Sequence, residues 1–144
     1  EDDRNNEQAI MERLAAAWNI EYHKLPMSYR MDFAVTKADA IVGFAEVKMR
    51  RMNWGQYPTI MLSMSKVHTA CQYHQSLKLP TVFVVGTMDG GCHYTHLHDV
   101  PGQAKLVYGG RTMQTRDSAD IEPPCAAISA ASRLRAPKSL AKPA

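Results

Sequence analysis

The chain has 144 residues, which suits one domain with a single hydrophobic core and leaves little room for a second. Hydrophobic residues make up 45% and charged residues 22%, proportions that exclude collagen-like, mucin-like and wholly disordered proteins. The formal charge is +3, and four basic residues near the C-terminus supply +4, so the rest carries −1: Arg133, Arg135, Lys138 and Lys142. We expect one domain over residues 1–132 and a basic, disordered tail over residues 133–144.

The cysteine content and the start of the chain bear on its compartment. The three cysteines are odd in number and have no CxxC spacing, which favours a reducing compartment over a disulfide framework. No apolar run approaches the ~18 residues of a membrane span. The opening EDDRNNEQ is acidic and polar, unlike a signal peptide. We expect a cytoplasmic protein without a membrane partner.

The first half of the chain predicts a helix followed by strands. A helical stripe up to about residue 19, capped by Asn5 or Asn6, consists of Ile10, Met11, Leu14 and Trp18. Alternating patterns then predict short strands over residues 20–23 and 29–35 and a longer strand over residues 40–49. On the longer strand, alternation groups Ile41, Gly43, Ala45 and Val47 on one side, and Val42, Phe44, Glu46, Lys48 and Arg50 on the other.

The second half predicts a loop over residues 51–59 and then an amphipathic helix ending near Pro80. Its stripe is Ile60, Met64, Val67 and Cys71, with Ser63 or Ser65 as cap. The apolar run 81–86 predicts a central strand, and a tight turn leads to a hairpin partner over residues 92–98. Weaker strand patterns occupy residues 105–108 and 124–129. The expected fold is α/β, a central mixed β-sheet flanked by helices in the order helix–strands–helix–strand.

Two carboxylates and a lysine converge in this arrangement. Asp32 lies in one predicted strand, and Glu46 and Lys48 lie at the end of the next. Glu46 and Lys48 are two positions apart, so their side chains project from the same face of the sheet. Two neighbouring buried acids are costly unless a cation compensates, and Mg²⁺ with oxygen ligands is the usual compensation. The alternative is a cross-strand salt bridge at a sheet edge.

These residues resemble the PD-(D/E)XK nuclease superfamily, whose pattern is an Asp on one strand and (Asp/Glu)-X-Lys on the next. The match is Asp32 with Glu46, Val47 and Lys48, and the resemblance covers residues 7–97. Met31 stands where the family pattern has Pro, a departure at that position that leaves the chemistry unchanged. The resemblance implies a restriction-endonuclease-like core similar to compact phage or archaeal-type nucleases, including Holliday junction resolvases, acting in a bacterial or phage-infected cell.

The resemblance also implies roles for these residues. Asp32 and Glu46 would hold Mg²⁺, with Mn²⁺ as a substitute and the Val47 carbonyl as a further oxygen ligand. Lys48 would orient or deprotonate the attacking water. Family members often carry a Glu on the first helix. We assign that role to Glu7, because it shares the apolar stripe whereas Glu12 points away. A helix N-terminal acid that favours the macrodipole is the alternative for Glu7.

Four residues are candidate DNA contacts. In similar nucleases the second helix often presents a polar or basic residue to the scissile phosphate, which here selects Ser65 and Lys66. Arg50 and Arg51 continue the strand of Lys48 and could hold flanking phosphates. Solvated surface positions are the alternative for each of these basic residues.

The expected function is a Mg²⁺-dependent phosphodiesterase acting on DNA, as an endo- or exonuclease. Phosphate contacts carry no base information, so a structure- or end-directed activity is expected rather than sequence-specific cutting. Cleavage of four-way junctions would need two coordinated sites and hence a homodimer. The alternative function is a non-catalytic nucleic-acid-binding or assembly module with the same fold.

Two other groups of side chains invite functional readings. Cys92, His93, His96 and His98 could bind zinc, but a second ligand cluster is lacking, so solvent-exposed hairpin histidines are the preferred interpretation. Trp54 and Tyr57 lie between basic residues and a helix. Their rings could stack on bases or be buried in the core.

Overall fold

The computed structural model describes residues 2–108 and 124–129, so the tail predicted over residues 133–144 lies outside the described residues. In chain order the elements are α1 (Asp2–Trp18), β1 (Glu21–Lys24), the 3₁₀ helix η1 (Met27–Tyr29), β2 (Phe33–Lys37), β3 (Ala40–Arg50), β4 (Thr59–Ser63), α2 (Met64–Leu77), β5 (Thr81–Thr87), β6 (Cys92–His96), η2 (Leu97–Asp99), β7 (Lys105–Tyr108) and β8 (Pro124–Ser129).

The main sheet has five strands in the order β1-β2-β3-β5-β6. Only the central pair in this sheet, β3 and β5, is parallel, and the other neighbours are antiparallel. Parallel strands need a long connection, and here β4 and α2 provide it. The predicted mixed α/β sheet is therefore confirmed.

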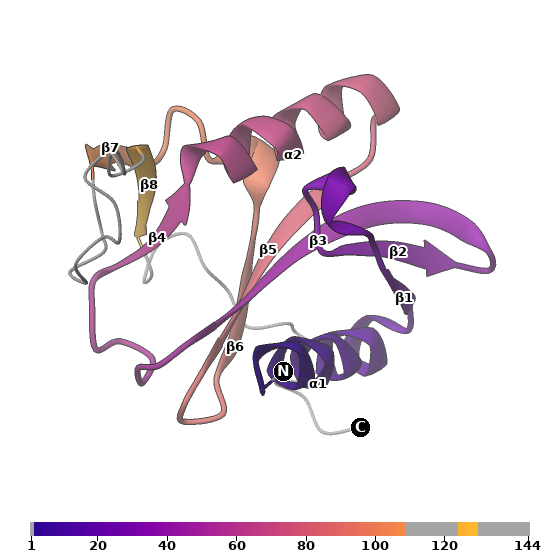
Figure 1. Ribbon diagram of the computed structural model, residues 1–144, viewed down its shortest axis with the longest axis horizontal. Helices are drawn as coiled ribbons and strands as arrows, with labels where there is room; N and C mark the ends of the chain where they lie inside the picture. The colour runs from indigo at the N-terminus through magenta and orange to yellow at the C-terminus, as the bar shows by residue number, and fades with distance from the viewer. Residues whose placement is uncertain (1, 109–123, 130–144) are drawn as a thin grey trace.

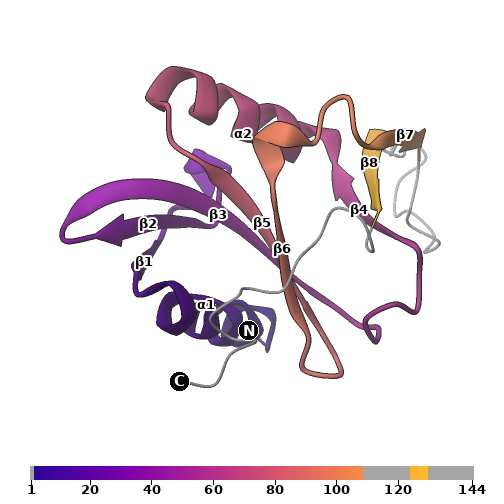
Figure 2. The same cartoon turned by 180° about the vertical axis from the view of Figure 1, so that it is seen from behind.

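The two helices cover opposite faces of this sheet (Figures 1 and 2). Strand β5 shows why both faces need cover, because every one of its residues is buried. Val82 and Val84 join the core beneath α1, whereas Phe83 and Val85 join the core beneath α2. This continuous apolar run is typical of a central strand that is covered on both sides.

Helix α1 packs through the predicted stripe. Ile10, Met11 and Leu14 are buried against the sheet, and the helix begins at Asp2, earlier than the predicted cap at Asn5 or Asn6. At Gly86 the sheet has no side chain to hold the helix away. A Cβ built there would lie 2.5 Å from Cδ1 of Ile10. The close approach fixes the position of α1 and of the residues on its inner face.

A second, antiparallel sheet of three strands has the order β4-β8-β7. It corrects the prediction that Ile60 begins the second helix. Ile60 lies in β4 and pairs with Ile128 of β8, and the helix starts at Met64 after an N-cap at Ser63. Both isoleucines are buried in the core beneath α2, so the second sheet extends that core. The alternating burial of β4 shows that one face of this strand packs on the core.

Three further features of the strands differ from the sequence prediction. The register between β2 and β3 shifts at Val42, so this half-buried side chain packs against the core beneath α1 instead of sharing the side of Phe44. Asp32 directly precedes β2 instead of lying inside a strand. Strand β6 ends at His96 and continues as η2, which buries Leu97. Among the described residues, no helix is long and apolar enough to cross a membrane.

Candidate active site

Glu46 is fully buried in the middle of the molecule. It lies on β3 between Phe44 and Lys48 on the face covered by α2, and its side chain has 0% exposure. Neither carboxylate oxygen has a hydrogen-bond partner that meets normal geometry. An ionisable group in such a place is costly to bury without a cation or proton, so Glu46 is the first residue that the core does not explain.

Two lysine ammonium groups approach this carboxylate from different elements. The Lys48 Nζ lies 3.6 Å from Glu46 Oε2, as their shared strand face predicts. The Lys66 Nζ, from the first turn of α2, lies 3.3 Å from Glu46 Oε1. It also donates a hydrogen bond of 2.9 Å to the carbonyl oxygen of Arg30. Arg30 has a φ of 60°, a left-handed conformation that is unusual for a residue with a side chain.

Asp32 is held beside Glu46 by the pairing of β2 and β3. Phe33 pairs with Ala45, so the preceding residue on one strand faces the following residue on the other. Asp32 Oδ2 accepts a hydrogen bond of 2.9 Å from the backbone N–H of Val47. This bond holds the Asp32 carboxylate beside the segment of β3 that carries Glu46 and Lys48.

Glu7 reaches the same region through Lys24, a residue on β1 that the sequence interpretation missed. The Lys24 Nζ lies 3.8 Å from Glu7 Oε2 and 3.7 Å from Asp32 Oδ1. It also lies 4.9 Å from the centre of the Phe33 ring. The Glu7 side chain is only 18% exposed, which agrees with its place on the inner stripe of α1. Glu12 instead accepts a hydrogen bond from the Tyr22 hydroxyl.

The charges around Glu46 shift its protonation equilibrium. Burial raises the pKa of Glu46 above its ordinary value of 4.5, and the negative charge of Asp32 raises it further. Lys66 and Lys48 lower the pKa but do not cancel the increase. Two lysines therefore leave the ionised carboxylate undercompensated, and a further cation would stabilise it.

The residues fit one hard divalent cation. The buried, unbonded oxygens of Glu46 and the adjacent Asp32 carboxylate are the oxygen donors that Mg²⁺ prefers, and Mg²⁺ commonly uses one or two carboxylates and keeps several waters. Within the part of the chain that the structure describes, no three histidine, cysteine or acidic side chains form a closed metal site. The role of the Val47 carbonyl as a metal ligand stays a prediction. The contact of Val47 with the site that the structure shows is made by its backbone N–H, which donates to Asp32.

The four predicted DNA contacts differ in exposure and in the groups that they contact. Ser65 is exposed, and its hydroxyl lies 2.9 Å from that of Ser63 at the start of α2. Arg50 donates a hydrogen bond of 2.6 Å to the carbonyl oxygen of Met61, which ties β3 to β4. Arg51 is exposed just after β3. Lys66 contacts Glu46 and Arg30, so it is placed with the carboxylates rather than in open solvent.

The histidines after Cys92 are half-buried, which corrects the prediction that they are exposed to solvent. The rings of His74 and His98 stack with centroids 3.8 Å apart, and His93 stacks on Trp54 at 3.5 Å. Stacked rings do not converge on a shared point as zinc ligands must. Neither stacked pair includes a residue of the carboxylate site.

Lys24 and the Arg30 carbonyl were missed because their roles depend on long-range register. Lys24 pairs with Phe33 across β1 and β2, and that pairing brings its ammonium group to Asp32. A charged residue at the end of a short polar strand carries no such signal in the sequence. The carbonyl of Arg30 becomes a partner of Lys66 only through the turn after η1.

Comparisons with known proteins place the chain in a family. Residues 1–131 match the family described as "Phage putative PDDEXK endonuclease". Among proteins with curated functions, none matches. One solved structure with this fold is Hjc of Archaeoglobus fulgidus, a Holliday junction resolvase from an archaeal hyperthermophile. It is 11% identical, with a TM-score of 0.53 over 88% of this chain and 85% of that chain. By the extent of the family match, this chain belongs to the phage PD-(D/E)XK endonuclease family.

Proposed function

We propose that the protein is a Mg²⁺-dependent endonuclease that hydrolyses phosphodiester bonds in DNA, with Asp32, Glu46 and Lys48 as its central residues. The observation that carries the proposal is the fully buried Glu46 carboxylate, whose pKa is raised despite two lysines within 4 Å. Ionisable groups with perturbed pKa values cluster at functional sites, because burial and neighbouring charges tune them for catalysis. Family membership supplies independent support.

We assign each residue a role from its contacts. Asp32 and Glu46 hold the divalent ion, which supplies charge stabilisation to the phosphoryl oxygens when bound. Lys48, whose side chain is 36% exposed, reaches both Glu46 and solvent, so as an ammonium group it can orient an attacking water, and as the neutral amine it can take the proton of that water. Lys66 keeps the Glu46 carboxylate oriented through Oε1, and Lys24 holds Asp32 and Glu7 together.

The substrate preference that we propose is for DNA structure or ends rather than base sequence. Arg50, Arg51 and Ser65 lie near the ends of β3 and α2, where they would contact phosphates, and phosphates carry no sequence information. A four-way junction is one candidate, because the Archaeoglobus protein that shares this fold is described as a junction resolvase. Junction cleavage would require a homodimer with two active sites.

The test is a cleavage panel of linear, nicked, single-stranded, flapped and four-way DNA with Mg²⁺, Mn²⁺ or EDTA. We expect cleavage with either metal and none with EDTA. Glu46→Gln and Asp32→Asn should each lower the rate by at least about a hundredfold, whereas Glu12→Gln, on the outer face of α1, should cleave like the parent.

The contrary outcome is also informative. Undiminished cleavage by well-purified Glu46→Gln would refute the site. Metal-independent DNA binding by the parent protein with no cleavage of any substrate would instead support the non-catalytic binding module.

A further inference from the structure

We propose that the pocket beside the end of β3 receives a single nucleobase, unstacked from the DNA strand that crosses the active site. The pocket has a volume of about 320 Å³ and is lined by residues from β3, the following loop and β4: Arg50, Met52, Tyr57, Pro58, Thr59, Ile60 and Met61. That volume is at the lower end of the range for small-molecule sites and suits one ring system rather than a duplex. This inference rests on the proposed function, since it names a substrate contact of the same site.

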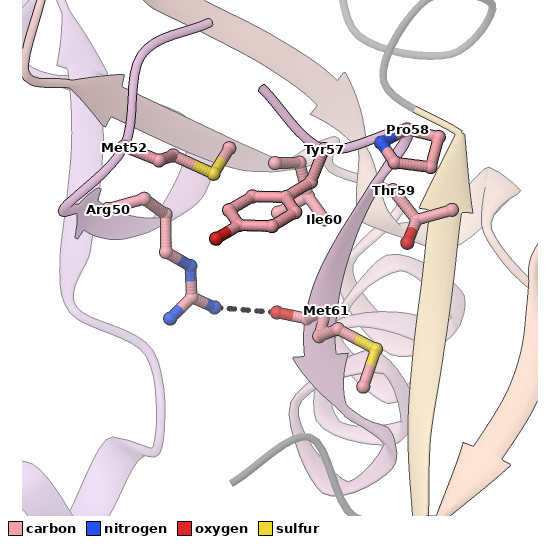
Figure 3. A pocket seen from close by; sticks show the side chains of 7 residues that line it. All are labelled: Arg50, Met52, Tyr57, Pro58, Thr59, Ile60 and Met61. Carbon is pink, nitrogen blue, oxygen red and sulfur yellow. Dashed lines mark hydrogen bonds between the residues drawn. The ribbon is translucent and has the colours of Figure 1, made fainter. Parts of the chain in front are cut away.

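Tyr57 supplies the stacking surface. Figure 3 shows its ring among the lining side chains, between Arg50 and Met52 on one side and Pro58 and Thr59 on the other. The residue is 53% exposed, so its ring is accessible to a ligand. Exposed aromatic rings stack on bases of any sequence, which agrees with a structure-directed enzyme.

The structure also decides between the two aromatic residues of this loop. Trp54 is half-buried and already stacks on His93, with ring centroids 3.5 Å apart. Its backbone N–H donates to Asp89 Oδ2 at 3.2 Å, and the backbone N–H of Met88 donates to the Met52 carbonyl at 2.9 Å. The loop is thereby attached to the turn between β5 and β6. Trp54 anchors the loop, and Tyr57 is presented on a fixed base.

A fixed platform matters because it lowers the cost of binding. An aromatic ring on a mobile loop loses conformational entropy when it stacks, whereas one held in place beforehand loses less. A further hydrogen bond, from the Gln56 N–H to the Asn53 carbonyl at 3.1 Å, closes the turn that precedes Tyr57.

The pocket lies in line with the active site. Arg50 follows Glu46 by four residues and Lys48 by two, on the same face of β3. At about 3.3 Å per residue, the Cα atoms of Arg50 and Glu46 are ~13 Å apart. One DNA strand advances about 3.4 Å per nucleotide, so a base in the pocket would lie within about four nucleotides of the bond that is cut.

Arg50 gives the pocket a cationic wall. Its guanidinium group is positioned by the hydrogen bond to the Met61 carbonyl (Figure 3). A guanidinium in the lining of a pocket that also holds an aromatic ring suits a ligand that combines a flat ring with a phosphate, as a nucleotide does. Met52 and Ile60, both buried, close the apolar floor.

The experiment uses single-stranded oligonucleotides carrying 2-aminopurine at successive positions, with Ca²⁺ in place of Mg²⁺. We expect the fluorescence to be quenched at one or two adjacent positions by the parent protein and by Tyr57→Phe. Tyr57→Ala should lose the position-specific quenching and bind at least about fivefold more weakly, the scale of one lost stacking contact. Tyr108→Ala is the matched control, because Tyr108 is an exposed tyrosine outside the pocket.

A second arm removes the base instead of the ring. An abasic site at the quenched position should weaken binding to the parent protein by the same factor and should not weaken binding to Tyr57→Ala further. Parental affinity and quenching in Tyr57→Ala, or equal losses in Tyr57→Ala and Tyr108→Ala, would overturn the pocket while active-site cleavage stands. Position-specific quenching by a protein that cleaves nothing would keep the pocket and refute the nuclease.

Discussion

The ammonium group of Lys66 lies 3.3 Å from Oε1 of Glu46 and 2.9 Å from the carbonyl oxygen of Arg30. It thus links the first turn of α2 to β3 and to the turn that leads into β2. Lys66 was selected from the sequence as a phosphate contact, and the structure shows it oriented toward the buried acid. We therefore expect Lys66 to act mainly by stabilising the ionised form of Glu46.

Replacing Lys66 should reveal this link as a loss of stability. We expect Lys66→Met to lower the free energy of unfolding by about 1 kcal/mol, because Glu46 loses a compensating cation that is itself partly exposed. The double variant Lys66→Met with Glu46→Gln should recover most of that loss, since no buried charge remains. Urea titrations of the parent and the three variants test this, and additive losses in the double variant would contradict it.

Lys48 should affect the rate more than binding. Lys48→Met leaves the proposed phosphate contacts of Arg50, Arg51 and Ser65 in place, so its affinity for DNA in Ca²⁺ should stay near that of the parent. Its single-turnover rate in Mg²⁺ should fall by at least about a hundredfold, the scale for removing a general acid–base group. If Lys48 were only a partner of Glu46, the variant would melt earlier and cleave in proportion to its folded fraction. A stable variant with near-parental cleavage would refute the catalytic role.

The raised pKa of Glu46 predicts the sign of a pH effect on stability. The folded protein holds the Glu46 proton more tightly than the unfolded chain does, because in the unfolded chain the pKa of this glutamate has its ordinary value of 4.5. Between that value and the raised folded value, the contribution of Glu46 to the free energy of unfolding falls as pH rises. Glu46→Gln removes this term, so its melting temperature minus that of the parent should increase from pH 4.5 to neutral pH. Calorimetry in EDTA measures the difference, and a constant or decreasing difference would contradict the shift.

Adding a divalent ion should stabilise the parent protein relative to Glu46→Gln. Mg²⁺ binds the folded protein, so it should raise the melting temperature of the parent, with little effect on Glu46→Gln or Asp32→Asn. The increase should shrink as pH falls through the raised pKa of Glu46, because a proton then competes with the metal. Equal Mg²⁺-induced shifts in the parent and in Glu46→Gln would show that the ion binds elsewhere.

Glu7 and Glu12 form a matched pair on α1. Glu7 reaches Asp32 through Lys24, whereas Glu12 contacts Tyr22. We expect Glu7→Gln to lower Mg²⁺ affinity by about tenfold, the lower end of the range for residues that orient metal ligands. Glu12→Gln should bind Mg²⁺ like the parent. Calorimetric titration with Mg²⁺ measures both affinities, and equal affinities in the two variants would remove Glu7 from the site.

Features that depend on local periodicity could be predicted from the sequence. The stripe of Ile10, Met11 and Leu14 identified the inner face of α1 and so selected Glu7 over Glu12. The continuous apolar run of β5 predicted a central strand. The spacing of Glu46 and Lys48 placed both on one face of β3, because side chains on a strand alternate regardless of what the strand packs against.

Features that depend on pairing between distant segments became visible only in the folded protein. Ile60 fits the helical pattern of the residues that follow it, but it lies in β4. The reason is that β8, far along the chain, supplies its hydrogen-bond partners. Lys24 reaches Asp32 only through the register of β1 on β2, and Lys66 reaches Glu46 only through the packing of α2 on the sheet. Burial of Glu46, and with it the raised pKa, arises from all the layers together, which no local pattern encodes.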